Sequence, residues 1–159
     1  MQRKTITGVY TVCTPDELTD DERRLVRCAI DATERSYAKY SHFRVGAALL
    51  LDDGDVVAGC NQENASFPVT ICAERAALFA AGAKKPDVAP VAIAIAARNG
   101  DGLTGNPVTP CGSCRQAMIE TEQRYGRSLR ILLYGTKCVY VIDGIRQLMP
   151  MSFTEDLLS

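Results

Sequence analysis

The amino-acid sequence predicts an α/β fold, a three-layer α/β/α sandwich around a mixed sheet of about five strands. After a first amphipathic helix, segments follow in the order strand, strand, helix, strand, helix, strand, strand. The outer strands form hairpin-like pairs, whereas the middle strand follows a helix, so both antiparallel and parallel pairs are expected. The composition, 47% hydrophobic and 23% charged, is typical of a globular protein, and we expect residues 1–159 to form a single domain.

The first part of the chain predicts a short strand, a helix and a hairpin. Residues 7–12 are rich in β-branched side chains, which favour a strand. Thr19-Asp20-Asp21-Glu22 has the capping-box pattern, and apolar residues at helical spacing extend the helix from about Asp20 to about Ala38. Strands at 44–51 and 56–60 flank an Asp-Gly turn. Small residues leave room on this hairpin for the helix that carries Cys72: Gly46, Ala47, Ala48, Ala58 and Gly59.

The second part predicts two helices and three strands. An alanine-rich helix covers 71–81 and is expected to end at Gly82. The apolar run 91–97 fits a parallel strand that is covered on both faces. Residues 98–109 form a loop, after which Thr109 and Pro110 are expected to begin a helix that runs from about Cys111 to Tyr125. Strands follow at 129–134 and 138–142, and a short helix at 143–148.

Charge and cysteine content limit the class of function. The net charge is −1, whereas proteins that bind long nucleic acids carry a strong basic surplus, so we expect a small or neutral partner. No apolar run is long enough to cross a bilayer and no targeting segment is visible, so a cytoplasmic protein is expected. The seven cysteines lack the spacing of a disulfide framework, and in a reducing compartment a C-x-x-C pair indicates a metal or redox site.

Two cysteine motifs together predict a catalytic zinc site. Cys72 opens one predicted helix, and Cys111 and Cys114 open another at the C-x-x-C spacing. Unpaired amides at a helix start stabilise thiolate, and three thiolates leave the fourth tetrahedral position of zinc open for a water molecule. Glu74 is expected to move the protons of that water rather than to bind zinc. Arg75 is expected to donate to the ligand sulfurs; the alternative is a surface ion pair.

The motifs resemble those of the zinc-dependent nucleoside deaminases, and among them the small homotetrameric cytidine deaminases. The resemblance covers most of the chain, in family order. It rests on Cys72-Ala73-Glu74-Arg75, Pro110-Cys111-Gly112-Ser113-Cys114-Arg115-Gln116, the strand motif at 40–48, the loop Asn61-Gln62-Glu63-Asn64-Ala65, and Leu148-Met149-Pro150-Met151-Ser152-Phe153.

This resemblance implies a cytidine deaminase-like fold, one Zn²⁺ per chain and a homotetramer with shared active sites. It implies hydrolytic deamination of cytidine and 2'-deoxycytidine in pyrimidine salvage, with hydroxide on zinc attacking C4 while Glu74 protonates N3 and then the departing ammonia. It assigns the ribose to Asn61 and Glu63. The other implied substrate contacts are Phe43, Ala73, the region of Cys111, and Phe153 from a neighbouring subunit.

Some positions depart from the pattern or are left open. Position 72 is Cys, whereas deaminases of polynucleotides resemble a His/Cys/Cys pattern, which favours a free nucleoside here. Thr70 stands where many relatives have Gly, and Phe67 stands where many have Tyr. Any contact that uses the tyrosine hydroxyl or the backbone freedom of the glycine is therefore in question. His42 is either a hydrogen-bonded structural residue or a proton shuttle. Cysteines that match no ligand position are interpreted as inert thiols: Cys13, Cys28, Cys60 and Cys138.

Three alternative functions remain from the sequence. A blasticidin-type deaminase would share the core motif and act on another cytosine-bearing compound. A structural zinc module would mediate protein contacts, although structural sites usually have four protein ligands. A dithiol redox protein would use Cys111 and Cys114 and leave Cys72 and Glu74 without a role.

Overall fold

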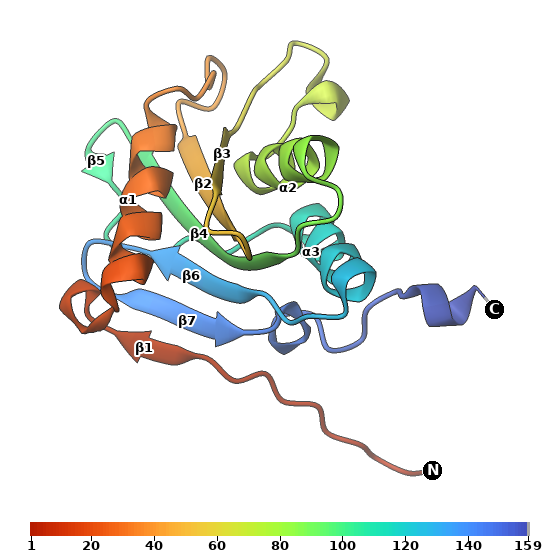
Figure 1. Ribbon diagram of the computed structural model, residues 1–159. Helices are drawn as coiled ribbons and strands as arrows, with labels where there is room; N and C mark the ends of the chain where they lie inside the picture. Colours follow the sequence, from red (N-terminus) through yellow and green to blue (C-terminus); the bar gives the residue numbers. More distant parts are fainter. Residues whose placement is uncertain (159) are drawn as a thin grey trace.

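A computed structural model describes residues 1–158 and shows one mixed sheet between two layers of helix (Figure 1). The strand order is β1-β7-β6-β4-β2-β3, with β5 beside β4. The strands are β1 (Thr11–Cys13), β2 (Arg44–Leu51), β3 (Val56–Cys60), β4 (Pro90–Asn99), β5 (Gly102–Leu103), β6 (Arg130–Tyr134) and β7 (Val139–Asp143). The helices are α1 (Asp20–Thr33), α2 (Ala73–Lys84) and α3 (Gly112–Tyr125).

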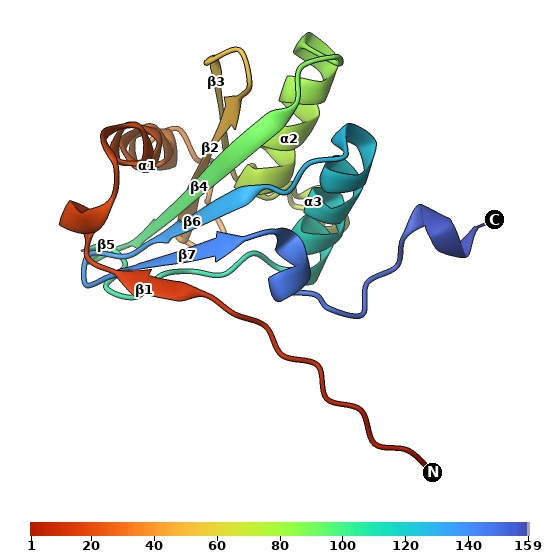
Figure 2. The same cartoon turned by 60° about the horizontal axis from the view of Figure 1, so that its bottom comes forward.

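The layers and the mixed sheet agree with the sequence prediction. Figure 2 shows α1 on one face of the sheet and α2 with α3 on the other. β4 runs parallel to β6, and every other strand pair is antiparallel. The five expected strands of the sheet are β2, β3, β4, β6 and β7. The short strand expected at 7–12 corresponds to β1, which begins only at Thr11, and β5, inside the predicted loop 98–109, was not expected.

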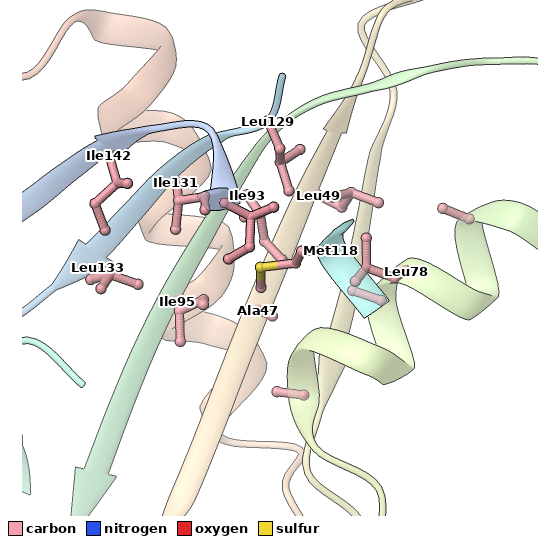
Figure 3. Packing of buried hydrophobic residues seen from close by; sticks show 14 of the residues in the cluster. Ala47, Leu49, Leu78, Ile93, Ile95, Met118, Leu129, Ile131, Leu133 and Ile142 are labelled. Atoms are coloured by element: carbon pink, nitrogen blue, oxygen red, sulfur yellow. The ribbon is translucent and has the colours of Figure 1, made fainter. Parts of the chain in front are cut away.

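The two faces of the sheet bury side chains of different size. Ile93 and Ile95 of β4 point toward α2 and α3, where they pack with Met118 (Figure 3). Ala94 and Ala96, the alternate residues of the same strand, lie in the core under α1. Side chains of a strand alternate between the two faces of the sheet, so β4 contributes residues to the hydrophobic core on each face, as its continuous apolar run predicts.

Close packing of helices on the hairpin is confirmed, but for both helices rather than one. A Cβ added at Gly59 would lie 2.5 Å from the backbone N of Ala77, so α2 rests directly on β3. A Cβ at Gly46 would instead lie 2.1 Å from the carbonyl oxygen of Ala29 in α1. The expectation that all these small residues face the helix of Cys72 was therefore wrong, because successive residues of a strand face opposite sides.

The capping box of α1 is confirmed, but its predicted end is wrong. The amide of Glu22 donates to Thr19 Oγ1 over 3.3 Å, and Glu22 Oε2 accepts from the amide of Thr19 over 2.9 Å. The helix ends at Thr33 rather than near Ala38. The amide of Tyr37 donates to the carbonyl oxygen of Asn61 instead, which draws this segment toward the end of β3.

The ends of α2 and α3 also differ from the sequence prediction. Gly82 lies inside α2, which continues to Lys84, because Gly82 keeps a helical backbone and no left-handed turn occurs there. The helix α3 begins after Cys111 rather than at Thr109 and Pro110, since the Cys111 carbonyl accepts the first helical hydrogen bond, from the amide of Arg115. Cys72 and Cys111 are thus the N-cap residues of the two helices.

Both ends of the chain leave the layered body. Residues 1–10 run outward from β1, and the segment after the 3-10 helix η3 (Ile145–Gln147) runs outward past α3 (Figure 1). We call residues 148–158 the C-terminal segment. No helix among residues 1–158 has the length and apolar character needed to cross a membrane.

Candidate metal centre and active site

Three cysteine sulfurs meet where α2 and α3 begin. The two helices lie on the same face of the sheet, and each starts with a cysteine in extended backbone conformation. Cys72 Sγ lies 3.9 Å from Cys111 Sγ, and the sulfurs of Cys72, Cys111 and Cys114 all lie within 4.8 Å of one another. No other group of three or more His, Cys, Asp or Glu side chains within residues 1–158 is arranged this way.

The sulfur geometry fits a tetrahedral zinc ion. Zinc–sulfur bonds of about 2.3 Å at tetrahedral angles place two sulfurs about 3.8 Å apart, close to the separation of Cys72 and Cys111. Thiolates are soft ligands that zinc accepts. Cys114 is buried, whereas Cys111 is exposed, so a fourth ligand has access from the side of Cys111.

Hydrogen bonds within the cluster favour the thiolate form of Cys72. A hydrogen bond from Cys114 lowers the pKa of Cys72 to about 5, and Arg75 and Cys111 contribute in the same direction against the effect of burial. The same hydrogen bond to Cys72, together with burial and the charge of Glu74, raises the pKa of Cys114. Cys72 is therefore a ligand that is already deprotonated near neutral pH, and zinc binding must displace the proton of Cys114.

The guanidinium group of Arg75 lies beside the ligand sulfurs. Its Nη2 atom is 3.7 Å from Cys72 Sγ and 3.5 Å from the carbonyl oxygen of Thr70. Its Nε atom is buried without a hydrogen-bond partner. Of the two sequence-based alternatives, these contacts support donation to sulfur, since no salt bridge found among residues 1–158 includes Arg75.

Glu74 is buried next to the sulfur cluster, with 5% of its surface exposed. Burial raises the pKa of its carboxyl group, and the nearby charge of Cys72 adds to this effect. A hydrogen bond with Cys114 lowers the pKa of the carboxyl group, and this bond means that Glu74 contacts the cluster. A buried carboxyl group with a raised pKa suits proton transfer beside a metal, because it can hold a proton that an exposed carboxylate would lose.

Asn61 and Glu63 brace the segment that leads into β2. Asn61 Oδ1 accepts from the amide of Val45 over 2.8 Å, and its Nδ2 donates to the carbonyl of Phe43 over 2.9 Å. Glu63 accepts from the amides of Tyr40 and Ser41, at 2.7 Å and 3.3 Å, and from the hydroxyl of Ser41. These contacts position Phe43, and they were not anticipated from the sequence.

A hollow of about 400 Å³ lies against this braced segment. It is lined by Tyr40, Ser41, Glu63, Phe67 and Thr70. Thr70 has φ −55°, so the position needs no glycine, and its hydroxyl accepts from the amide of Asn64 over 3.1 Å. The ring of Phe67 meets the ring of Tyr40 edge-on, with 5.8 Å between centroids.

The remaining predicted contact residues lie in different surroundings. Ala73 is fully buried, so only its backbone is available to a substrate. Phe153 is 54% exposed on the C-terminal segment and does not line the hollow of its own chain. His42 has a left-handed backbone, φ 55°, at the turn into β2, and it is not part of the sulfur cluster.

Comparison with known proteins assigns the family. Residues 19–125 match the family model described as the cytidine and deoxycytidylate deaminase zinc-binding region. The chain belongs to this deaminase family. It is 52% identical over 101 residues to a cytidine deaminase of Halalkalibacterium halodurans, covering 63% of this chain and 71% of the relative. It is 36% identical over 142 residues to a cytidine deaminase of Sporosarcina psychrophila, covering 87% of this chain and 96% of the relative.

Solved structures of cytidine deaminases share the fold of this family member. The crystal structure from Burkholderia pseudomallei matches with a TM-score of 0.71 and 39% identity, covering 86% of this chain and all of that one (100%). The structure from Mycobacterium tuberculosis matches with a TM-score of 0.66 and 32% identity, covering 86% and 99%. The predicted fold and family are therefore confirmed.

Membership in the deaminase family confirms the cofactor. The protein is a zinc-dependent hydrolase of this family, and Cys72, Cys111 and Cys114 form its zinc site. With three protein ligands, the site differs from the closed four-ligand sites of structural zinc modules. The family assignment also argues against a dithiol redox protein, because all three thiols belong to the metal site.

Proposed function

We propose that the protein converts cytidine and 2'-deoxycytidine, with water, into uridine and 2'-deoxyuridine, and releases ammonia. One observation carries the proposal: a buried carboxyl group, Glu74, lies against a three-thiol zinc site that keeps one position open. This arrangement supplies both groups that hydrolysis of an amidine C–N bond needs, an activated water and a proton carrier. The relatives named cytidine deaminase support the same substrate class.

Glu74 is the group that we assign to proton transfer. Zinc, when bound, acts as a Lewis acid that lowers the pKa of water in its open position. Glu74 takes a proton from the attacking water and gives it to N3 of the cytosine ring as the water oxygen bonds to C4. It then takes the remaining proton of that oxygen and delivers it to the amino group, which leaves as ammonia as the C4–N bond breaks. Its burial matters because it raises the pKa of the carboxyl group and so favours the protonated form, which is the form that gives a proton.

Arg75 is the group that we assign to charge balance. Three thiolates exceed the charge of one Zn²⁺, which weakens a Lewis acid. The guanidinium, 3.7 Å from Cys72 Sγ, draws electron density from a ligand sulfur and offsets that excess.

The nucleoside is assigned to the hollow beside the braced segment. Glu63 lines it, while Asn61 bonds to the backbone of Phe43 and Val45, on both sides of the first residue of β2. Both carboxylate oxygens of Glu63 already accept from protein groups, yet each has further acceptor capacity for a ribose hydroxyl. Phe43 and the backbone of Ala73 do not line this hollow; we assign them to the rest of the nucleoside, with Ala73 at the base edge.

The proposed working form is a cytoplasmic homotetramer of single-domain chains that share active sites and serve pyrimidine salvage. A groove of about 680 Å³ lies along α2 and α3, and Phe79 in its lining is 56% exposed. Such an apolar groove is typical of a surface that another subunit covers. Phe153 is exposed as well, and in the tetramer it is assigned to the nucleoside site of a neighbouring chain.

The assay that tests this function follows the loss of cytidine absorbance with purified, zinc-loaded protein. We expect turnover of cytidine and 2'-deoxycytidine, with stoichiometric ammonia, and none of cytosine in a polynucleotide. Parallel assays with blasticidin S separate the blasticidin-type alternative, since that enzyme would prefer it to cytidine. Absence of turnover of both nucleosides by an oligomeric, metal-replete sample would overturn the proposal.

A further inference from the structure

Arg115 joins the C-terminal segment to the zinc-binding loop, as we call residues 110–111 at the start of α3. It follows the ligand Cys114 on α3, and its Nε donates to the carbonyl oxygen of Pro110 over 2.9 Å. Pro110 directly precedes the ligand Cys111. The Nη1 atom of the same guanidinium donates to the carbonyl oxygen of Leu148 over 2.8 Å. One planar group therefore spans two segments that are 38 residues apart in the sequence, 110 and 148.

Gln116, the next residue, holds the same segment at a second point. Its Nε2 donates to the carbonyl oxygen of Phe153 over 2.9 Å. This contact is made to the backbone, so the ring of Phe153 stays exposed while its position is fixed relative to α3. A ligand and two anchors thus occupy consecutive positions, Cys114, Arg115 and Gln116.

The geometry needs an arginine at position 115. A guanidinium donates from several nitrogens of a rigid fork, so it can serve two carbonyl oxygens in different directions. A lysine carries its donors on one nitrogen atom at the end of a flexible stem, which does not reproduce this fork. The C-terminal segment runs outward past α3 (Figure 2). The amides of Leu148 and Met149 also donate to the carbonyl oxygen of Ile145, so Arg115 adds to contacts at the start of the segment, whereas Gln116 reaches farther along it, to Phe153.

We propose that Arg115 and Gln116 clamp the C-terminal segment to the zinc-binding loop and thereby position Phe153 for the substrate. They are positioning residues, because they act on the substrate through Phe153 and on zinc through Pro110 and Cys111. The part that concerns substrate rests on the proposed function, in which Phe153 contacts the nucleoside. The part that concerns the coupling of loop and segment does not.

A first experiment tests Gln116 through Phe153. Gln116→Leu removes the donor at similar volume, and we expect KM to rise by about fivefold, as for one lost hydrogen bond, with kcat and zinc content nearly unchanged. In a Phe153→Ala background the same substitution should change KM little, because the ring on which it acts is gone. An equal rise in KM on Gln116→Leu in the original protein and in Phe153→Ala would overturn the positioning role of Gln116.

A second experiment tests the coupling without an activity assay. Amide hydrogen exchange in residues 148–153 should be faster in Arg115→Met and Gln116→Leu than in the original protein. Zinc release to a colorimetric chelator should be faster in Arg115→Met, with Arg115→Lys between it and the original protein. Unchanged exchange in both variants, or unchanged zinc release in Arg115→Met, would contradict the clamp.

Arg127→Met is the matched control. Arg127 lies just after α3 and pairs with Asp52 over 2.6 Å, and no hydrogen bond of its side chain found among residues 1–158 reaches the zinc ligands or the C-terminal segment. We expect its exchange, zinc release and KM to equal those of the original protein. If the original protein fails to deaminate nucleosides, the proposed function fails, while exchange and zinc release still decide the coupling. If Arg115→Met does not fold, Gln116→Leu decides it.

Discussion

At the scale of single residues, the proposed chemistry rests on a carboxyl group that is kept out of solvent. Glu74 follows the ligand Cys72 by two positions, at the buried start of α2. Because three sulfurs and one water complete a tetrahedron, the carboxyl group is left free for proton transfer. Its role as a non-ligand is therefore open to a direct test.

Glu74→Gln should keep about one zinc per chain and lose activity by a factor on the order of 10² to 10⁴, the usual contribution of acid–base catalysis. The amide retains the shape of the side chain but cannot exchange protons. Metal analysis and the cytidine assay measure the two effects separately. Asp101→Asn, in the exposed loop before β5, is the control and should change neither. Loss of zinc from Glu74→Gln would mean that Glu74 is a ligand.

At the scale of elements, the position of α2 is set by a glycine on the neighbouring strand. Gly59 allows the backbone of α2 to rest on β3, and α2 carries both Cys72 and Glu74 at its start. A side chain at position 59 would meet backbone atoms of Ala73 and Ala77 at 2.6 Å and 2.5 Å, and backbone cannot swing aside as a flexible side chain does.

Gly59→Ala should therefore lower the free energy of unfolding by about 1–3 kcal/mol, as overpacking does, and should also weaken zinc binding because it displaces Cys72. Denaturant unfolding and zinc competition with a chelator measure the two effects. Gly100→Ala serves as the control, since nothing lies within 4 Å of a Cβ at that position. A stable Gly59→Ala with normal zinc affinity would show that α2 can shift without cost to the site.

The start of α1 carries an element-scale dependence on pH. Burial disfavours the charged form of Glu22, but hydrogen bonds from the amide of Thr19, 2.9 Å away, and from Arg130 Nε, 2.6 Å away, outweigh it and lower the pKa. The folded protein thus favours the carboxylate. The stabilisation is complete above the pKa of the unfolded chain, about 4.3, and is lost as pH falls through the lower folded value.

Glu22→Gln should accordingly be less stable than the original protein at pH 7, and the difference should shrink in acid. Denaturant midpoints of metal-free protein at pH 7 and about pH 3 measure this, so that zinc loss does not contribute. A difference that is the same at both pH values would show that the charge of Glu22 is not the cause. Asp21→Asn, next to it and without such bonds to its side chain among residues 1–158, is the matched control.

At the scale of the whole molecule, the exposed groove along α2 and α3 is assigned to contact between subunits. We expect Phe79→Asp to dissociate the proposed tetramer into smaller species, because it would place a charge in the proposed apolar interface. Deaminase activity should fall as the tetramer dissociates, since the proposed active sites are shared between subunits. Light scattering together with the cytidine assay checks this, and Ile6→Asp on the outward N-terminal residues is the control. A Phe79→Asp protein that stays tetrameric would place the interface elsewhere.

The zinc ligands and the fold class were predictable because their signals are local. Three cysteines at helix starts, the C-x-x-C spacing and the alternation of strands with helices can each be recognised within a short stretch of chain. The capping box at Thr19 and Glu22 was equally local, and the structure confirms it. The ends of α1 and α2 were less predictable, since a distant partner, Asn61, and a glycine that stays helical decided them.

The sequence by itself determined which atoms bind zinc and which carboxyl group stands beside them, since ligand type and spacing within one turn of helix are properties of the chain. Only the tertiary structure decided that Asn61 and Glu63 bond to the segment before and at the start of β2. It also decided that Gly46 packs against α1 and Gly59 against α2, on opposite faces of the sheet, and that Arg115 bonds to Leu148. Each of these contacts joins segments that are separated in the sequence, and only the pairing of strands and the packing of helices and the C-terminal segment around the sheet bring them together.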